Sequence, residues 1–479
     1  MADNITKKSQ DVSSWYNDVV LAAKLAEHGP ARGTIIIRPY GYAIWEGIQR
    51  YLDTKIKSFG VDNAYFPLFI PNSLLQKEKS HVEGFSPELA VVTHGGGEEL
   101  AEPLVVRPTS ETIMYDAYSR WISSYRDLPL KINQWNNVVR WEKRPYLFLR
   151  GTEFLWQEGH TAHATHDDAI DMAKNALDAY VDTYQNQLAL FGYAGRKSES
   201  ERFAGAAVTY TYEALMPDGK IVQSCTSHDL GQNFAKAFNI KFQDQNSENQ
   251  YVWQTSWGLS TRSIGALILA HGDDNGLVLP PAVAPYQVVI VPIHGKDGDH
   301  EKIGQLTQRA FEVLETSGLR VKVDSTENSP GWKFNEADLQ GIPLRIEIGM
   351  TEIESETVKI VIRWPETRDV HNFKISELAL EVEKLLDTMQ KDLLQAHKDW
   401  TLANTREVGT YDEFKEIMGT VRGFIKAYWC EDAGCEAKIK EETKATVRVL
   451  TFDEEVETEG KCVGCGNKAS HRWLFGQSY

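Results

Sequence analysis

The sequence predicts an α+β protein whose first and largest unit is an antiparallel sheet flanked by helices. An α/β domain and a small C-terminal α+β unit follow it. Segments within residues 206–257 alternate apolar and polar side chains, as antiparallel strands do. From Tyr286 onward, apolar strands and helical segments follow one another in turn, which is typical of an α/β domain. Four of the five cysteines lie between residues 430 and 465. We therefore expect three units, at residues 1–283, 284–400 and 401–479.

The composition is that of an ordinary globular protein. The 479 residues are 42% hydrophobic and 25% charged, and the mean hydropathy is −0.39. The first residues lack the apolar segment of a secretory signal and no run of 18 apolar residues occurs, so we expect a cytoplasmic protein with no membrane partner. The net charge of −17 argues against non-specific nucleic-acid binding, but it leaves room for a local basic patch.

The first unit should begin with two amphipathic helices, at 11–27 and 42–59. A buried strand is expected at 63–71, at a sheet edge or a domain boundary, because Pro67 cannot donate to a ladder. Further strands are expected at 91–97 and 103–111, followed by a helix at 112–125. Thr165 should cap a helix that runs to Gly192. Strands at 206–215, 220–226 and 251–257 and an apolar helix at 263–270 complete the unit.

A charged hairpin at residues 138–163 is the most unusual part of this unit. One strand should end at Arg140 and Glu142, and a basic loop over 143–145 should lead to a returning strand from Phe148 to Trp156. A guanidinium suits a phosphate group, and an aromatic face suits a purine ring. Taken alone, the stretch could equally be an exposed hairpin in which Arg140 pairs with Glu142.

The α/β domain should contain strands at 286–293, 319–324, 344–349 and 357–364, with helices at 300–317, 334–340 and 376–397. Its continuous apolar strands favour a mixed or mostly parallel sheet.

Three segments of the first unit, each with polar residues near the end of an expected strand or helix, together resemble the signature motifs of class II aminoacyl-tRNA synthetases. The first motif corresponds to the helix 42–59 and the strand that reaches Pro67. The second corresponds to Arg140-Trp-Glu142 and Arg150-Gly-Thr-Glu-Phe154, and the third to Gly258-Leu-Ser-Thr-Arg262 with its helix.

Four further strings are similar to pocket sequences of the prolyl-tRNA synthetase family. They are Arg107-Pro-Thr-Ser-Glu111, Phe154-Leu-Trp-Gln-Glu-Gly-His160, Gln223-Ser-Cys-Thr-Ser-His228 and Trp257-Gly-Leu-Ser-Thr-Arg262. The roughly hundred residues from Phe154 to Gly258 are already filled by a helix and strands, so no large editing insertion is expected. The C-terminal cysteine unit resembles the archaeal/eukaryote-like branch of the family.

The resemblance implies a homodimeric ligase that uses ATP and Mg²⁺ to make prolyl-adenylate and then transfers L-proline to the 3′-terminal adenosine of tRNA(Pro). It implies that Arg140 clamps the α-phosphate and also touches the proline carboxylate, that Arg262 holds the far phosphate, and that Phe154 stacks on adenine. Glu142 and Arg150 would frame the nucleotide. The remaining polar positions around ATP and Mg²⁺ would be filled by Gln223, Thr226 and Ser260. Of this set, Arg140, Glu142 and Arg262 are the expected catalytic residues.

For proline, the resemblance places the secondary ammonium at Thr109 and Glu111. The slot would be lined by Trp156, Glu158 and His160 and closed by His228. The spacing of His160, His163 and His166 does not match the usual metal-ligand patterns, so we expect His163 and His166 to be structural or exposed. Cys225 is expected to be a small packed residue, because the reaction needs no covalent enzyme intermediate. Gly95–Gly97 should form a loop that could close over the site.

The family reads anticodon guanines in the segment that here carries Lys333, Glu336, Asp338 and Arg345. Carboxylates accept from guanine N1 and N2, and cations donate to its O6 and N7. A solvated helix face is a comparable explanation for any one of the four. Cys430-x4-Cys435 and Cys462-x2-Cys465 predict a closed, structural Zn²⁺ site. Tyr479 resembles a C-terminal tyrosine that folds back towards the active site. The alternatives are a class II synthetase for another small amino acid, such as threonine or histidine, and a catalytically silent, synthetase-like binding protein.

Overall fold

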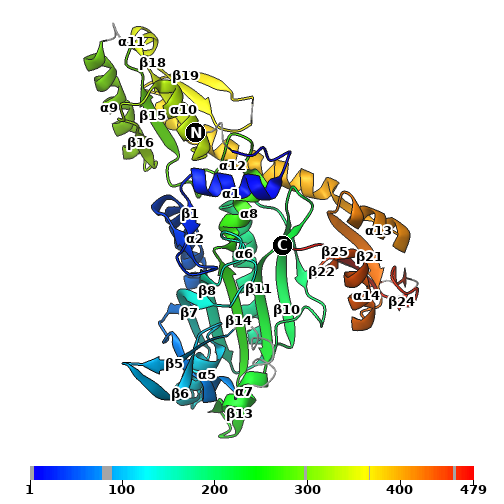
Figure 1. Ribbon diagram of the computed structural model, residues 1–479. Coiled ribbons are helices and arrows are strands. Elements are labelled where there is room, and N and C mark those ends of the chain that lie inside the picture. Colours follow the sequence, from blue (N-terminus) through cyan, green and yellow to red (C-terminus); the bar gives the residue numbers. More distant parts are fainter. Residues whose placement is uncertain (1–4, 78–88, 296–298, 366, 457–459) are drawn as a thin grey trace.

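The computed structural model describes residues 5–77, 89–295, 299–365, 367–456 and 460–479. The first unit fills the centre and bottom of the molecule, the α/β domain lies at the upper left, and the C-terminal unit projects to the right (Figure 1). One long helix, α12 (Leu378–Ala403), runs between the last two. It continues through residue 400, so the boundary expected there falls inside a helix. No helix in the described ranges is both long enough and apolar enough to cross a membrane.

The first unit is built on an antiparallel sheet with strand order β9-β10-β11-β14-β8-β7, to which β3 adds in parallel. The antiparallel sheet predicted for this unit is confirmed. In register, Thr209 pairs with His228, His228 with Ser256, and Ser256 with His160. The strands are β3 (Asp62–Asn63), β7 (Leu130–Val139), β8 (Glu153–His163), β9 (Tyr193–Arg196), β10 (Val208–Leu215), β11 (Ile221–Gly231) and β14 (Trp253–Ser260).

Helix α6 (His166–Asn186) covers one face of this sheet. Thr165 caps it as predicted, accepting a bond from the Asp168 amide. Two of its tyrosines reach the sheet: Tyr180 donates to Gln157, and Tyr184 donates to the Ser224 carbonyl. Because side chains alternate along a strand, the residues next to Gln157 in sequence face the opposite side of the sheet.

The remaining elements of the first unit surround this sheet. Helix α2 begins with Pro39 at its first position and buries Ile44, Trp45, Ile48, Leu52 and Ile56, which confirms the predicted amphipathic helix. The other elements are α1 (Val12–Ala22), β1 (Ala26–His28), β2 (Ile35–Ile37), α2 (Pro39–Ser58), β4 (Phe69–Pro71), α3 (Asn72–Leu75), β5 (Ala90–Gly95), β6 (Glu98–Val106), α5 (Glu111–Trp121), the 3-10 turn η3 (Tyr125–Asp127), α7 (Asn233–Phe238), β12 (Lys241–Gln243), β13 (Asn249–Tyr251) and α8 (Arg262–His271).

Several expectations for this unit were wrong. The first helix ends at Ala22 rather than at residue 27, and α6 ends at Asn186 rather than at Gly192. The strand expected at 63–71 is divided: β3 joins the large sheet and β4 joins a separate sheet with β5 and β6, with Pro67 in the gap between them. The returning strand of the hairpin begins at Glu153 rather than at Phe148. Phe148 is buried in the connection with a φ of 60°, a left-handed conformation that a regular strand does not contain.

The second unit is an α/β domain with a mixed sheet, as predicted. β15 pairs in parallel with β16 and β17, whereas β18 and β19 add in antiparallel fashion. The short elements α11 and β19 were not foreseen. The elements are β15 (Val288–Pro292), α9 (His300–Thr316), β16 (Val321–Val323), α10 (Pro330–Leu339), β17 (Leu344–Ile348), α11 (Met350–Ser355), β18 (Thr357–Ile362) and β19 (Val370–Lys374).

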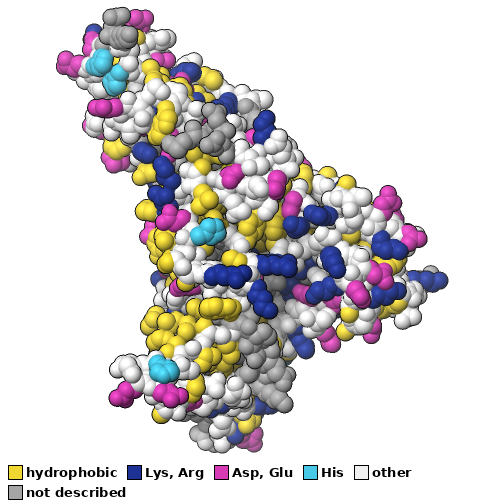
Figure 2. Space-filling view, viewed as in Figure 1, with side chains coloured by type: hydrophobic (Ala, Val, Ile, Leu, Met, Phe, Trp, Pro, Cys, Tyr) yellow, Lys and Arg dark blue, Asp and Glu magenta, His cyan; other side chains and the backbone are white. Residues whose placement is uncertain are grey.

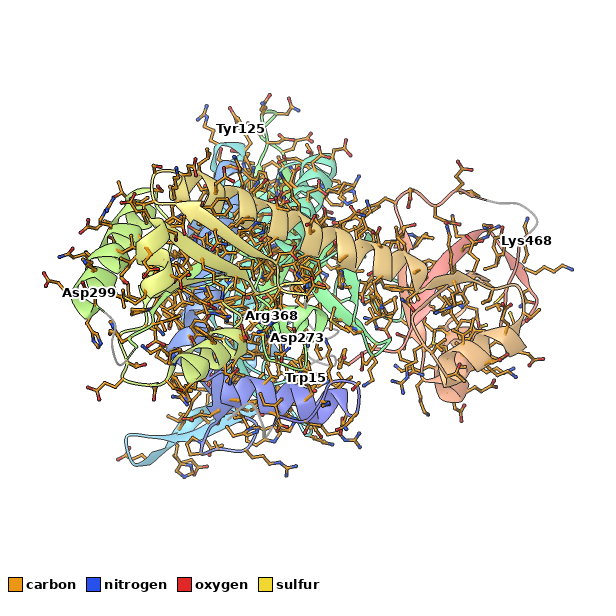
Figure 3. All side chains as sticks on the ribbon, turned by 90° about the horizontal axis from the view of Figure 1, so that it is seen from above. Trp15, Tyr125, Asp273, Asp299, Arg368 and Lys468 are labelled. Carbon is orange, nitrogen blue, oxygen red and sulfur yellow. The ribbon has the colours of Figure 1, made fainter. Side chains whose placement is uncertain are left out.

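Asp273 joins this domain to the first unit. Its carboxylate accepts two bonds from Arg363, at 2.6 and 2.7 Å, and its carbonyl accepts a bond from the Trp15 indole. A two-point guanidinium–carboxylate pair fixes orientation as well as distance. Seen from above, Asp273 and Trp15 lie close to each other and to Arg368 of the α/β domain (Figure 3).

The C-terminal unit continues the large sheet of the first unit. Its strand β22 pairs with β9, Leu450 opposite Arg196 and Thr451 opposite Gly195, which gives an 11-stranded sheet in all. Gly195 permits this approach, because a Cβ there would overlap the Leu450 carbonyl. The elements are β20 (Thr405–Glu407), α13 (Tyr411–Gly419), β21 (Phe424–Trp429), α14 (Ala433–Thr443), β22 (Thr446–Thr451), β23 (Gly460–Lys461), β24 (Lys468–Ala469) and β25 (His471–Gly476).

Candidate active site

A cavity of about 250 Å³ opens on the face of the sheet opposite α6. Strands β8, β11 and β14 form its floor, and the start of α5, the end of β7 and the start of α8 form its rim. All the active-site residues predicted from the sequence line it, except Glu142 and Arg150. Those residues are Thr109, Glu111, Arg140, Phe154, Trp156, Glu158, His160, Gln223, Thr226, His228, Ser260 and Arg262.

Arg140 lies against two aromatic rings at the rim. Its guanidinium carbon is 5.5 Å from the centre of the Phe154 ring and 5.3 Å from that of Trp156. Its Nε donates to the Pro108 carbonyl at 3.0 Å. Glu142 accepts a bond from the Arg144 amide and lies outside the cavity lining. The hairpin therefore presents Arg140 and Phe154 to a shared space.

Positive charge accumulates at this end of the cavity. Arg262 begins α8 and donates from Nε to the Leu149 carbonyl at 3.1 Å. Burial lowers its pKa, and the neighbouring cations Arg140 and Arg150 lower it further. Arg150 thus acts on the site electrostatically, although it does not line the cavity. Three guanidinium groups held this close favour an anionic ligand.

The opposite end of the cavity contains a buried carboxylate with its hydrogen bonds satisfied. Glu158 is 1% exposed and accepts bonds from the Ser110 amide and hydroxyl and from the side chains of Gln134 and Asn136. His160 Nε2 lies 3.0 Å from its second oxygen. Burial raises the pKa of Glu158, but the bonds from His160 and its other donors lower it overall.

His160 and Glu111 belong to the same buried group. Burial lowers the pKa of His160, but the charges of Glu111 and Glu158 raise it overall, which favours the imidazolium. Glu111, at the start of α5, accepts a bond from the Thr109 hydroxyl and is 2% exposed. This end of the cavity thus combines two carboxyl groups with an imidazole whose pKa is raised.

His228 closes this end in its neutral form. Its Nδ1 lies 3.0 Å from the Thr209 hydroxyl, and its ring stacks on Phe203 with centroids 4.5 Å apart. Burial and the nearby cations lower its pKa to about 3. A neutral ring packed on a phenyl ring gives this wall an apolar surface.

Several further residues that line the cavity were given no role in the sequence analysis. Three of them, Lys197, Glu201 and Phe203, come from the connection between β9 and β10, whose polar composition is that of a surface loop and gave no signal of a cavity wall. The additional residues are Lys197, Glu201, Phe203, Thr209, Ser224, Ser256 and Trp257, together with Cys225. Cys225 is 4% exposed, and burial raises its thiol pKa well above the usual value, in agreement with the packed role expected for it.

The other histidines have the structural roles predicted for them. His163 is buried and bonds Asp168 and Thr161. His166 bonds Asp229 and stacks on Trp253. The glycines at 95–97 lie at the turn between β5 and β6.

The four residues proposed to read the anticodon do not form a solvated helix face. Lys333, Asp338 and Arg345 are all less than a tenth exposed. Arg345 lies between Asp338 and Glu347, at 3.1 and 3.0 Å, and over the Phe334 ring. Lys333 donates to the Asp324 carbonyl, and Glu336 pairs with Lys24 of the first unit.

The four C-terminal cysteines come from two segments of the unit, residues 430–435 and 462–465, and lie close together. Their sulfur atoms all lie within 4.8 Å of one another, and the pairs Cys435–Cys462 and Cys430–Cys465 are each 3.6 Å apart. That separation is far longer than a disulfide bond, and all four are free thiols. The geometry is that of a candidate metal site.

Tyr479 lies beside the cavity. Its hydroxyl donates to Asp218 at 2.6 Å, and its amide donates to the Ile221 carbonyl. A second, polar chamber of about 160 Å³ is lined by Tyr479 and shares Gln223 and Arg262 with the first.

Comparison with known proteins gives matches over nearly the whole chain. Residues 93–271 match the class II tRNA synthetase core domain (G, H, P, S and T), residues 287–385 match an anticodon-binding domain, and residues 411–479 match the prolyl-tRNA synthetase C-terminal domain. These three segments correspond to the three units of the fold.

Relatives of similar length match from end to end. The chain is 51% identical to a proline–tRNA ligase of Natranaerobius thermophilus over 478 residues, covering 99% of this chain and 98% of the relative. It is 50% identical to that of Chlorobium phaeobacteroides over 487 residues, covering all of both. A crystal structure of prolyl-tRNA synthetase from Cryptosporidium parvum, complexed with halofuginone and AMPPNP, matches with a TM-score of 0.95 and 43% identity over 99% of each chain. The protein belongs to the prolyl-tRNA synthetase family of class II aminoacyl-tRNA ligases.

Proposed function

We propose that this cavity activates L-proline with ATP to form prolyl-adenylate and then transfers proline to the 3′-terminal adenosine of tRNA(Pro). The observation that carries the proposal is the arrangement of charge within one cavity. Guanidinium groups lie at one end, and a small slot of carboxyl groups, the His160 imidazole and aromatic walls lies at the other. An anionic nucleotide fits the first end, and a small amino acid with an ammonium group fits the second. We assign residues 1–283 to catalysis, 284–400 to anticodon binding and 401–479 to the metal-binding unit.

At the nucleotide end, Arg140 would bind the α-phosphate and Arg262 the far phosphate, with Phe154 stacked on adenine. The carboxylate of proline attacks the α-phosphorus and pyrophosphate leaves, so the enzyme's task is to hold two anions together and to neutralise the charge that spreads over the phosphate oxygens. The contact of Arg140 with two rings supports this, because it leaves the guanidinium few other orientations. Glu142 and Arg150 would frame the nucleotide from outside the cavity lining.

Mg²⁺ would accompany ATP and supply further neutralisation of the phosphates. It prefers oxygen ligands and usually binds through substrate phosphates and few protein groups. The hydroxyl and amide oxygens of Thr226, Ser260 and Gln223 line the cavity and fit that preference.

At the proline end, Glu111 and Thr109 would bind the secondary ammonium. We assign Glu111, which begins α5 and accepts a bond from the Thr109 hydroxyl at the cavity, as the carboxyl group that binds the substrate ammonium. Trp156 and His228 would enclose the pyrrolidine ring. No side chain has to transfer a proton in the activation step, which agrees with the absence of any role for the buried Cys225 thiol.

The test is an ATP–pyrophosphate exchange assay with each of the twenty amino acids. Exchange stimulated by proline alone supports the proposal. Stimulation by threonine or histidine instead would show a different specificity, and no stimulation at all would show a binding protein without catalysis.

For tRNA, we propose that Lys333, Glu336, Asp338 and Arg345 read the anticodon guanines. Support comes from the match to an anticodon-binding domain and from the ion pairs that hold the Arg345 and Asp338 side chains in fixed positions. Lys and Arg side chains also gather across the middle of one face of this acidic protein (Figure 2). Replacing an anticodon guanine of tRNA(Pro) by adenine should lower kcat/KM for aminoacylation by about tenfold or more, at unchanged proline activation.

We propose that Cys430, Cys435, Cys462 and Cys465 hold a structural Zn²⁺. Four thiolates at about 2.3 Å from a tetrahedral ion are separated by about 3.8 Å. The observed separations of 3.6 Å fit that geometry. Metal analysis of the purified protein tests this, and a native fold without zinc would contradict it.

We also propose a cytoplasmic homodimer. Near the first motif, Ile36, Tyr65 and Phe69 are 45%, 72% and 46% exposed, which is unusual for large apolar side chains. Figure 2 shows hydrophobic side chains gathered at the lower left, where Figure 1 places β5 and β7. Sedimentation equilibrium should give twice the chain mass, and a monomer would contradict the proposal.

A further inference from the structure

The connection between β9 and β10 forms one wall of the catalytic cavity. Its residues Lys197, Glu201 and Phe203 all line the cavity. The side chain of Lys197 is 1% exposed. The roles proposed above use none of the three.

The C-terminal unit holds this connection from behind. Strand β22 pairs with β9 at the point where the connection begins, with Leu450 opposite Arg196. Glu436 of α14 then accepts bonds from the hydroxyl groups of Ser198 and Ser200. A wall of the cavity is therefore built on contacts with a unit more than 200 residues away in the sequence.

Arg448 is the deepest of these contacts. It lies on β22, is 3% exposed, and donates from Nε and from one terminal nitrogen to Glu213 Oε2, at 3.1 and 2.7 Å. Glu213, on β10, is fully buried. Its other oxygen accepts a bond from Thr211 and lies 3.2 Å from Lys197 Nζ. Glu213 is thus shared between one cation of the C-terminal unit and one cation of the cavity wall.

Because Glu213 pairs with both Arg448 and Lys197, this group determines the charge that the cavity wall presents to a ligand. Arg448 also lies 4.0 Å from Glu201, so the group contains two cations and two carboxyl groups, and Lys197 is its cation on the cavity side. Apart from its ion pair with Glu213, Nζ of Lys197 has no hydrogen-bond partner in the described part of the chain, so further donors are available to a ligand. Without Arg448, Glu213 and Glu201 would both lose this cation, and the carboxylate of Glu213 would be paired with Lys197 alone. A buried charge that loses its partner also draws its neighbours into new positions.

We propose that Arg448 is a positioning residue for proline activation: through Glu213 it holds Lys197 on the cavity wall with its positive charge directed at the anionic substrates. This proposal rests on the proposed function of the cavity. It assigns the C-terminal unit a part in activation that is separate from tRNA binding, and it assigns Lys197 as a further residue of the site.

The experiment compares four variants by ATP–pyrophosphate exchange: Arg448→Ala, Lys197→Met, the double variant, and Arg448→Lys. Misplacement by about 1 Å of a group in a catalytic site costs up to about 10²-fold. Arg448→Ala should therefore lower kcat/KM for ATP by about 10- to 100-fold, and Lys197→Met should do the same. The double variant should be no worse than the poorer single one, because both single variants act on the position and charge of Lys197. Arg448→Lys should recover most of the activity.

Arg472→Ala serves as the matched control, since Arg472 lies on β25 of the same unit and pairs with the exposed Glu407. It should leave exchange unchanged. Metal content and the unfolding transition are measured for each variant, and if Arg448→Ala does not fold, Lys197→Met and Arg448→Lys carry the comparison. Wild-type exchange in Arg448→Ala would overturn the proposal, as would single effects that simply multiply in the double variant. Absence of proline-dependent exchange in the wild-type protein would instead overturn the proposed function.

Discussion

Replacing Gly159 by alanine should damage the cavity, although Gly159 itself does not line it. Gly159 lies on β8 between the cavity residues Glu158 and His160, and it pairs with Trp257 of β14. The indole of Trp257 lies directly over it. A Cβ at residue 159 would fall 2.2 Å from two carbons of that ring, where ordinary contacts are 3.4–4 Å. The ring or the strand must therefore move by about 1.2 Å.

The cost follows from the packing around the indole. Trp257 is 1% exposed and packs near Tyr180 of α6, so it has little room to withdraw. Overpacking of this kind destabilises a core by about 1–3 kcal/mol. Any movement taken up by β8 displaces Glu158 and His160 instead, and we expect kcat/KM for proline activation to fall by about 10²-fold.

The assay is ATP–pyrophosphate exchange together with urea unfolding of Gly159→Ala. Gly304→Ala is the control, because Gly304 lies in the exposed middle of α9 and a Cβ there meets nothing within 4 Å. This control should be neutral or stabilising by up to about 1 kcal/mol, since alanine favours a helix over glycine. Wild-type kinetics and stability in Gly159→Ala would refute the reasoning.

Three further predictions concern the site, the response to acid and the metal unit. Glu111→Gln should raise KM for proline by about 10- to 100-fold, because a hydrogen bond to a charged group contributes about 1.5–3 kcal/mol. KM for ATP should stay near the wild-type value. Equal changes in both constants, measured by ATP–pyrophosphate exchange, would contradict the assignment of Glu111 to proline. Burial lowers the pKa of His228 and His271 to about 3 and that of His397 to about 4. Below pH 6.5 the unfolded chain therefore binds protons that the native protein does not. The free energy of unfolding should fall as the pH falls, by about 2 kcal/mol per histidine at pH 5. A free energy of unfolding that is unchanged between pH 7 and pH 5 would refute this prediction. Cys462→Ser should release the metal and lower the unfolding temperature, as followed by metal analysis and thermal unfolding. The control Cys225→Ser should retain the metal. Full metal content in Cys462→Ser would argue against the four-thiolate site.

Local sequence determined much of this fold. The apolar spacing in α2, the Thr165 cap of α6 and the continuous apolar strands β15 and β17 follow from propensity and periodicity, which depend on neighbours a few residues away. The proposed active-site residues were named from strings that resemble a known family, and strands β8, β11 and β14 with the segments around them bring most of these residues to one cavity. The split of the strand at 63–71 was missed, since Pro67 signals an interruption but not which sheet each half joins.

Only the tertiary structure decided how the C-terminal unit meets the first one. Nothing in residues 196–203 distinguishes a cavity wall from an exposed loop, and nothing near Arg448 indicates a partner more than 200 residues earlier. Both depend on the pairing of β22 with β9, which is set by long-range packing rather than by local preference. The charge that Lys197 presents, the neutral state of His228 and the burial of the ion pairs around Arg345 likewise arise from groups that folding alone brings together. A sequence can show which side chains are present, but their protonation and their partners depend on the environment in which the fold places them.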